Sequence, residues 1–253
     1  MEKMDIKALV TGGCGEVGQY VLQAFDCDNY DIKNGDDIFD TDKLVERMKG
    51  KDLVVHLAAY AHPFMKGITD ADYNHLNKDG TAQVVACMRR AGVKRILFMS
   101  TGGVYGFSSG TPHVKYLPID EEHELAPEDR LTTYDKTKIF CENYLTTQKG
   151  IKGYVLRLEA PGVIERGFNV FREHLWAHIR EGNFIDLLQR LAKYKGKSDI
   201  FNAGDPRKAD SCPDTIEFAK REYPDAEIKL KNGFEPLVSV DKARRLLGYA
   251  SNL

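Results

Sequence analysis

Short apolar runs alternate with amphipathic stretches over the first 160 residues of the chain. The runs that predict buried strands lie at 6–10, 52–59, 92–100 and 154–158, and a weaker second strand is placed at 29–32. Apolar residues at helical spacing predict helices at 19–25, 41–48, 77–90 and 132–148. Strands that alternate with helices form parallel sheets covered by helices on both faces. The pattern therefore predicts an α/β fold with a doubly wound parallel sheet.

The alternation weakens after about residue 162. Residues 101–130 are rich in Gly, Pro, Ser and Asp and predict a long loop. Helical spacing returns at 170–179, 185–194, 213–223 and 239–247, with one short strand at 199–204. No repeat or Gly/Ser-rich linker separates these segments. We therefore expect a main domain at 1–161 and a small C-terminal region at 162–253 that caps one end of the sheet and does not fold independently.

Composition excludes several classes of partner. The chain has 253 residues, of which 42% are hydrophobic and 29% charged, and its net charge of -2 gives no case for binding nucleic acid or an anionic membrane. No apolar run approaches the roughly 18 residues of a membrane-spanning helix. The N-terminus leads almost directly into the first strand, and the five cysteines are scattered. We expect a cytoplasmic protein with reduced thiols and no signal peptide.

A glycine-rich turn joins the first strand to the first helix. Residues 11–18 are Thr-Gly-Gly-Cys-Gly-Glu-Val-Gly. Gly12 would allow a sharp turn, Gly15 would leave room for a pyrophosphate, and Gly18 would let the helix pack close to the strand. Amide groups and the dipole at a helix N-terminus favour a bound phosphate. The turn predicts a dinucleotide site, with an ordinary strand–helix turn as the alternative.

The second strand should end in a carboxylate that accepts hydrogen bonds from the adenosine ribose of a dinucleotide. Asp31 is the first candidate. Because it lies nearer the glycine loop than the usual spacing of about 20 residues, Asp28 is an alternative, as is a solvated loop carboxylate. No arginine stands nearby to hold a 2′-phosphate, and Lys33 is the only neighbouring cation. The segment favours NAD over NADP.

Two groups of polar residues could carry chemistry. Tyr134 and Lys138 are four positions apart on a predicted helix, so they share a face. The ammonium group would lower the tyrosine pKa from about 10 and make the phenol a usable acid or base. Ser100 and Thr101 follow an apolar strand, where open parallel sheets bind their ligands. Each pattern also occurs on ordinary surface helices and turns.

Histidines give a weaker signal. His174 and His178 are four positions apart on a predicted helix and could share a metal ion. No third ligand is evident in the sequence, so we interpret them as surface or half-buried residues beside Trp176 and predict no metal site. His56 stands inside an apolar run and is interpreted as a core histidine.

The series of motifs resembles the extended short-chain dehydrogenase/reductases, specifically the NAD-dependent epimerase/dehydratase family. The match extends over nearly the whole chain: T-G-G-x-G-x-x-G at 11–18, H-L-A-A at 56–59, Asn77 followed by Gly-Thr at 80–81, G-V-K-R at 92–95, S-T-x-x-V-Y-G at 100–106, P-x-D-E at 118–121, Y-x-x-x-K at 134–138, F-N-A-G at 201–204 and D-K-A-R-R-L-L-G-Y at 241–249. The resemblance implies a Rossmann-type fold, an enzyme, and NAD as cofactor, with NADP less expected.

The resemblance also implies roles for residues. Tyr134 would be the acid/base, Lys138 would lower its pKa and hold the nicotinamide ribose, and Thr101 would bond to the substrate hydroxyl or carbonyl. The residues that would contact the cofactor are Gly12, Gly15, Glu16, Val17, Gly18, Asp31, Asp37, Ile38, Leu57, Ala58, Ala59, Tyr60, Asn77, Ser100, Tyr134, Lys138 and Leu158.

The implied function is that of an NAD-dependent epimerase or dehydrogenase acting on a sugar or nucleotide sugar. Gly102 and Gly103 stand where the 4,6-dehydratases of the family carry Asp-Glu, so dehydration is disfavoured. Ala160 stands where the family often has an Asn that contacts a nucleotide-sugar phosphate. The cap is smaller than usual, which implies a smaller substrate or a site completed by a partner subunit.

Two further expectations concern alternatives and partners. The alternative function is that of a dinucleotide-binding regulatory protein without turnover, although such regulators commonly lack the Tyr or the Lys. The resemblance also implies a homodimer formed through the helices at 77–90 and 134–148.

Overall fold

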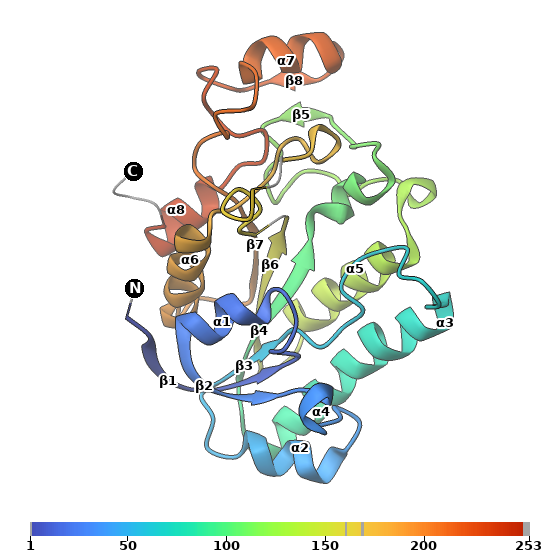
Figure 1. Ribbon diagram of the computed structural model, residues 1–253, viewed down its shortest axis with the longest axis vertical. Coiled ribbons are helices and arrows are strands. Elements are labelled where there is room, and N and C mark those ends of the chain that lie inside the picture. Colours follow the sequence, from blue (N-terminus) through green and yellow to red (C-terminus); the bar gives the residue numbers. More distant parts are fainter. Residues whose placement is uncertain (1, 160, 168–169, 250–253) are drawn as a thin grey trace. The chain divides into compact units, whose positions relative to one another are not determined.

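A six-stranded sheet forms the centre of the fold (Figure 1). The structure is a computed structural model that describes residues 2–159, 161–167 and 170–249. The strand order is β2-β1-β3-β4-β6-β7, and β1 pairs in parallel with both β2 and β3, as β3 does with β4. The strands are β1 (Met4–Thr11), β2 (Phe25–Tyr30), β3 (Leu53–His56), β4 (Arg95–Thr101), β6 (Lys152–Leu158) and β7 (Asp199–Ala203). The Rossmann-type parallel sheet with flanking helices is confirmed.

Helices connect most of these strands. They are α1 (Gly18–Ala24), α2 (Thr41–Met48), α3 (Asp70–Tyr73), α4 (Gly80–Ala91), α5 (Thr133–Thr146), α6 (Glu181–Lys193), α7 (Thr215–Glu222) and α8 (Asp241–Leu247). A π-helical turn, Asn74–Asp79, joins α3 to α4, so the helical stretch begins before the predicted residue 77. A second, two-stranded sheet pairs β5 (Tyr116–Leu117) with β8 (Glu227–Ile228). Within the described ranges, no helix is long and apolar enough to cross a membrane.

The second strand begins four residues earlier and ends two residues earlier than the predicted range of 29–32. It spans Phe25–Tyr30, where the helix was expected to reach residue 25, and Ile32 instead begins a short 3-10 turn. β2 is at the edge of the sheet and has β1 as its neighbour. Only its end residues, Phe25 and Tyr30, are buried, and the four between them are partly or fully exposed, so it lacks the apolar run that marks an interior strand.

The helix predicted at 170–179 is wrong. Over these residues the structure has one 3-10 turn, Arg172–His174, followed by Leu175 and Trp176 with φ angles of +52° and +50°. Left-handed backbone at two successive residues ends a right-handed helix. The apolar spacing there reflects burial of a loop. The predicted loop at 101–130 likewise contains three 3-10 turns and β5.

The chain folds into two compact units. The first consists of Met1–Ser100, Thr133–Leu156 and Leu191–Ile200, and the second of Thr101–Thr132, Arg157–Arg190 and Phe201–Leu253. The loop after β4 thus belongs with the C-terminal segments, and the units do not follow the expected boundary at residue 161.

A continuous apolar core stabilises the first unit. Side chains from β1, β3, β4 and β6 pack with those from α2, α4 and α5. Its fully buried members include Leu9, Val54, Ile96 and Val155 from the strands and Leu44, Met48, Val84, Met88, Cys141 and Leu145 from the helices. This packing fixes the helices that carry several of the predicted site residues.

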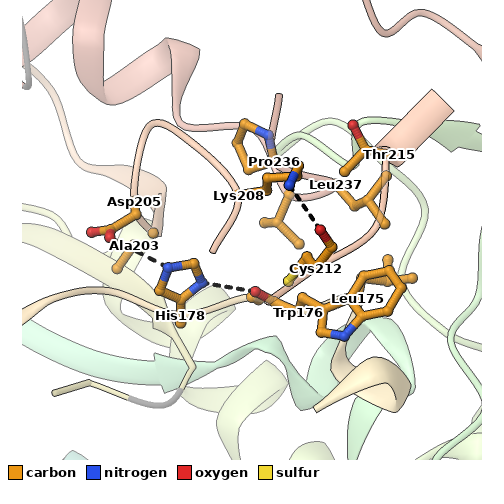
Figure 2. Close-up of a pocket in the computed structure, with 13 residues that line it drawn as sticks. Leu175, Trp176, His178, Ala203, Asp205, Lys208, Cys212, Thr215, Pro236 and Leu237 are labelled. Carbon is orange, nitrogen blue, oxygen red and sulfur yellow. Dashed lines mark hydrogen bonds and ion pairs between the residues drawn. The ribbon is translucent and has the colours of Figure 1, made fainter. Parts of the chain in front are cut away.

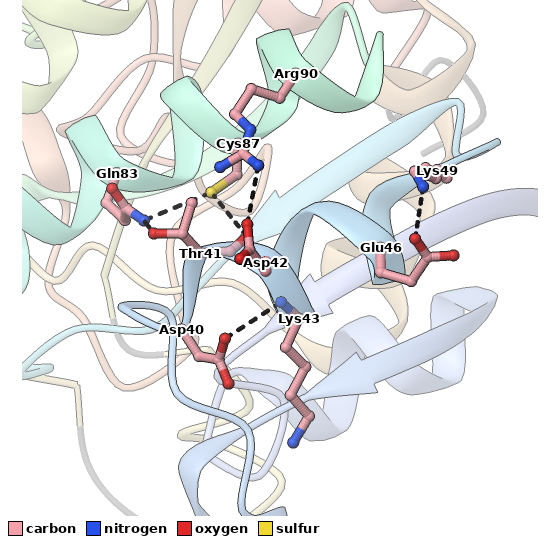
Figure 3. Close-up of polar contacts among 9 residues, drawn as sticks. All are labelled: Asp40, Thr41, Asp42, Lys43, Glu46, Lys49, Gln83, Cys87 and Arg90. Carbon is pink, nitrogen blue, oxygen red and sulfur yellow. Dashed lines mark hydrogen bonds and ion pairs between the residues drawn. The ribbon is translucent and has the colours of Figure 1, made fainter.

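Polar contacts tie α2 to α4 at the edge of this core (Figure 3). The Gln83 amide donates to the Thr41 hydroxyl over 2.7 Å, and Arg90 pairs with Asp42 at 2.9 Å. The buried Cys87 thiol donates to the Thr41 carbonyl. Burial raises the pKa of Cys87, so this thiol is a packing residue and a poor nucleophile.

Candidate cofactor and catalytic site

Glycine occupies the positions after β1 for different structural reasons. Gly12 has φ +77°, and a Cβ there would lie 2.5 Å from the backbone nitrogen of Ala58. A Cβ at Gly18 would lie 2.1 Å from the carbonyl oxygen of Gly13. A Cβ at Gly15 would meet only the Gly12 carbonyl oxygen, at 3.4 Å. The fold itself thus requires glycine at 12 and 18, whereas at 15 glycine leaves open space beside the loop.

Asp31 is bound directly to the glycine loop. It follows β2, is 5% exposed, and its Oδ2 accepts a hydrogen bond from the Cys14 amide over 2.8 Å, while Oδ1 accepts one from the Lys33 amide. Asp28 instead lies on β2 and pairs with Lys51 at 2.7 Å, with its side chain 47% exposed. Of the two predicted alternatives, the structure brings Asp31 to the loop.

The segment after Asp31 contributes less than expected. The Asp37 carboxylate accepts a hydrogen bond from the Phe39 amide over 2.9 Å and so caps its own turn. The Ile38 side chain is 5% exposed and packs into the core of the first unit. Both side chains are thus engaged within the protein. The Tyr30 hydroxyl at the end of β2 donates to the Asp37 carbonyl and keeps the backbone of this segment close to β2.

The loop after β3, residues 57–60, is held by hydrogen bonds from two sides. The Leu57 amide donates to the Thr11 carbonyl at the end of β1. The buried Asn77 side chain accepts from the Tyr60 amide over 2.9 Å and donates to the Thr137 hydroxyl on α5. Asn77 lies in the π-helical turn, a distortion often found at functional sites. Asn77 therefore positions the loop that contains the predicted cofactor residues Leu57, Ala58, Ala59 and Tyr60.

His56 is a core residue, as predicted. It is 1% exposed, and its ring nitrogens bond with the hydroxyls of Thr11 at 2.7 Å and Thr81 at 3.1 Å. Desolvation, helped by the charge of Lys138, lowers the pKa of His56 to about 3. The imidazole is therefore neutral and links β1, β3 and α4.

Tyr134 and Lys138 share the buried face of α5. Tyr134 is 6% and Lys138 4% exposed, and the Lys138 ammonium lies 5.6 Å from the centre of the tyrosine ring. The same ammonium donates to the Met99 carbonyl over 2.9 Å. Burial lowers the pKa of Lys138 to about 8. The predicted helix face exists, and it points into the first unit.

Ser100 has a partner that the sequence interpretation missed. Its hydroxyl donates to the carboxylate of Glu142 on α5 over 2.6 Å, and Glu142 is 2% exposed. Glu142 stands four positions after Lys138, so one helix face carries the phenol, the ammonium and this carboxylate. The spacing from Lys138 was a signal that could have identified it.

Thr101 has a second overlooked partner. Its hydroxyl donates to Glu159 Oε1 over 3.0 Å and accepts from the Gly103 amide over 2.9 Å. Glu159 follows β6 directly after Leu158, which is 7% exposed. A carboxylate immediately after a buried strand of a parallel sheet was the available signal. The neighbouring Ala160 lies outside the described residues.

The two histidines at 174 and 178 do not converge on a metal site. His174 Nδ1 lies 2.9 Å from Glu159 Oε2, whereas the buried His178 lies 3.3 Å from Asp205 and bonds to the Trp176 carbonyl (Figure 2). The left-handed residues between them remove the helical spacing. Within the described residues, no group of three or more His, Cys, Asp or Glu side chains is placed to hold a metal ion.

The cavity drawn in Figure 2 is too small for a sugar nucleotide. It lies beside His178 in the second unit. The volume of about 20 Å³ that the centre of a water molecule can occupy there is enough for about one water. Lys208 closes one side by donating to the Cys212 carbonyl over 2.8 Å. The buried hydroxyl of Thr215 in its wall has no hydrogen-bond partner among the described residues, which fits a water site.

Comparison with known proteins places these features in a family. The model of the NAD dependent epimerase/dehydratase family matches residues 8–208. The dTDP-D-glucose 4,6-dehydratase of Mus musculus is 27% identical over 217 residues, which cover 74% of this chain and 57% of the mouse protein. The N-acetyl-alpha-D-glucosaminyl-diphospho-ditrans,octacis-undecaprenol 4-epimerase of Escherichia coli O157:H7 is 30% identical over 258 residues, covering 94% of this chain and 68% of that protein.

A solved structure agrees with the fold. The UDP-glucose 4-epimerase from Brucella ovis, in complex with NAD, superimposes with a TM-score of 0.70 at 18% identity and covers 96% of this chain and 93% of that one. The chain spans just over half of the mouse relative's length and about two thirds of the E. coli relative's. Because the family model matches well over half of the sequence, the chain belongs to the NAD-dependent epimerase/dehydratase family.

Proposed function

We propose that the chain is an NAD-dependent epimerase or dehydrogenase that transfers a hydride from a hydroxyl-bearing carbon of a nucleotide sugar. The observation that carries this proposal is the buried Tyr134–Lys138 pair on one face of α5. A regulator would have no need of a buried ammonium beside a phenol, because burial of a charge is costly. Family membership and the nucleotide-sugar relatives support the substrate class.

The first unit has residues that fit NAD. Gly15 leaves open space beside the loop, and Glu16 and Val17 lead from it into α1, of which Val17 is the N-cap, as a pyrophosphate site requires. Each oxygen of the Asp31 carboxylate accepts one hydrogen bond from a backbone amide and can accept another from a ribose hydroxyl. A 2′-phosphate would meet this negative charge, so NAD is favoured over NADP. Bound NAD would supply the hydride acceptor.

Tyr134 is the proposed acid/base. Its phenol oxygen takes the proton of the sugar hydroxyl during oxidation and returns it during reduction. The Lys138 ammonium, fixed by the Met99 carbonyl, stabilises negative charge on that oxygen. Thr101 is the proposed partner of the substrate oxygen. Gly102 and Gly103 supply no carboxyl group, so we propose epimerase or dehydrogenase chemistry in preference to 4,6-dehydration.

Tyr134→Phe tests this proposal. We expect the variant to lose at least about 100-fold in hydride transfer, because it lacks the acid/base, and to keep its affinity for NAD. The assay follows NADH absorbance and sugar products with a panel of UDP-, GDP- and dTDP-sugars and free uronic acids. Tyr144→Phe, on the same helix but stacked on Phe140, is the control and should be unchanged.

The panel also separates the proposed enzyme from a regulator. Bound NAD without turnover of any sugar by the wild-type protein would contradict the proposal. If Tyr134→Phe in addition kept full activity in cells, a dinucleotide-binding regulator would be the better description.

A further inference from the structure

A second charged group is buried on the face of α5 that carries Tyr134 and Lys138. Glu142 is 2% exposed and stands four positions after Lys138, so the two side chains lie on the same face of the helix, within the first unit. Burial of a carboxylate or an ammonium is costly unless the charge is compensated. The burial of both groups on one helix face indicates that each lowers the cost of burying the other.

The Glu142 carboxylate is bound to the end of β4. The Ser100 hydroxyl donates to Glu142 Oε1 over 2.6 Å, a length typical of a hydroxyl bonded to an ionised carboxylate. The residue before it, Met99, accepts a hydrogen bond from the Lys138 ammonium over 2.9 Å through its carbonyl. Two adjacent residues of β4 are thus bound by two side chains of α5 that lie one helical turn apart. These bonds fix the carboxylate and the ammonium on the same stretch of strand.

The other contacts of the ammonium are aromatic. Lys138 Nζ lies 4.7 Å from the centre of the Phe98 ring and 5.6 Å from that of the Tyr134 ring. Ring faces and a backbone carbonyl attract an ammonium but carry no net charge. They therefore leave its positive charge to be balanced by an ionised group nearby.

The titratable side chains around Lys138 differ in charge. His56 on β3 has a pKa of about 3 and is neutral. Burial raises the pKa of the Cys141 thiol on α5, which is therefore also neutral at pH 7. Burial lowers the pKa of Lys138 to about 8, and the Coulomb effects of Cys141 and Glu142 oppose this. Of the two opposing groups, it is Glu142 that supplies a negative charge at neutral pH.

We propose that Glu142, held by Ser100, is a positioning residue of the Tyr134–Lys138 pair, and that its negative charge balances the buried Lys138 ammonium. The proposal rests on the proposed function, because it concerns the group that assists the phenol. Glu142 acts through Lys138 and is not itself the acid or base. Its charge keeps the ammonium protonated, and therefore able to stabilise negative charge on the phenol oxygen, up to a higher pH.

Titration of Lys138 tests the proposal without any substrate. Full-length protein labelled with carbon-13 at lysine Cε is followed by NMR between about pH 5 and pH 10, and the Lys138 signal is identified by its loss in Lys138→Met. We expect the Lys138 pKa to be lower by about one unit in Glu142→Gln, since loss of a negative charge disfavours the ammonium. Glu46→Gln, whose side chain on α2 is 70% exposed, is the control and should leave this pKa unchanged.

A second variant separates charge from packing. Glu142→Gln keeps the length of the side chain and can still accept from Ser100, whereas Glu142→Asp keeps the charge and is shorter. We expect the Lys138 pKa in Glu142→Asp to be closer to that of the wild type. The opposite ranking, or no shift in Glu142→Gln, contradicts the proposal. A shift in Asp135→Asn, which removes another buried carboxylate of α5, with none in Glu142→Gln would assign the balancing charge to Asp135 instead.

NADH formation with the nucleotide-sugar panel measures the consequence for the reaction. Because Glu142→Gln loses the Lys138 proton at a lower pH, its rate relative to the wild type should fall as the pH rises, by less than about twofold at pH 6 and by about fivefold at pH 8. A loss equal at every pH is the result expected of disturbed packing and contradicts the proposal. Absence of NADH from the wild-type protein with every sugar contradicts the proposed function, and the titration then still decides whether Glu142 balances Lys138.

Discussion

Asp28 and Asp31 stand three positions apart, and their carboxylates have different surroundings. Asp28, on the edge strand β2, is half exposed and pairs with Lys51. Asp31 is buried and binds the amides of Cys14 and Lys33. A carboxylate bonded to the glycine loop can both hold that loop and accept from a ribose, whereas an exposed ion pair contributes little to stability or binding.

Asp31→Asn should therefore weaken NAD binding while Asp28→Asn should not. We expect the dissociation constant for NAD to rise by about tenfold or more in Asp31→Asn, because a charge-assisted hydrogen bond is lost. In Asp28→Asn it should change by less than about twofold. Calorimetric titration with NAD measures both. The opposite ranking of the two variants would assign the ribose contact to Asp28.

At the scale of elements, the glycine loop contains two glycines that the fold requires and one that only a bound ligand would require. Gly12 and Gly18 are held by close backbone contacts, so substitution there disturbs the fold. Gly15 has no such contact closer than 3.4 Å. Its lack of a side chain matters to the loop only if a ligand approaches the backbone there.

Gly15→Ala should leave the protein folded and impair its cofactor site. We expect the unfolding free energy to stay within about 1 kcal/mol of the wild type and the NAD dissociation constant to rise by about tenfold or more. Denaturant unfolding and calorimetry measure the two quantities. Gly182→Ala in α6, where a Cβ would meet nothing within 4 Å, is the control and should leave NAD binding unchanged. Unimpaired NAD binding by Gly15→Ala would remove the pyrophosphate from this loop.

At the scale of the whole molecule, one helix face of the first unit bears on assembly. The predicted dimer helices correspond to α4 and α5, both in the first unit. Phe140 on α5 is 41% exposed, stacks on Tyr144, and has the Lys78 ammonium 4.6 Å from its ring centre. An exposed aromatic ring on a helix face is the kind of residue that anchors an interface.

Phe140→Glu should convert a dimer into monomers. We expect the wild-type protein to sediment as a dimer at micromolar concentration and the variant as a monomer, because a charge replaces the exposed aromatic ring that the dimer would bury. Phe234→Glu, at a 65% exposed position of the second unit, should leave the assembly unchanged. A monomeric wild-type protein would contradict the dimer through these helices.

The local sequence patterns predicted helices and strands best where one physical factor dominates. The helix at 41–48 matches α2 to the residue, because an N-cap at Asp40 and three buried apolar positions agree. The interior strands were found from their apolar runs. The edge strand β2 and the buried loop at 170–179 were misplaced, since edge exposure and left-handed backbone leave no distinct periodicity.

By itself, the sequence determined the parallel α/β fold, the glycine loop, and the Tyr134–Lys138 face, because each depends on neighbours within one or two turns of chain. Only the tertiary structure showed that Asp31 bonds to the glycine loop while Asp28 pairs with Lys51, and it alone joined Thr101 to Glu159 and Ser100 to Glu142. Those pairs are separated by many residues in the chain, so no local spacing specifies them, and they meet only where separate strands, helices and loops pack together.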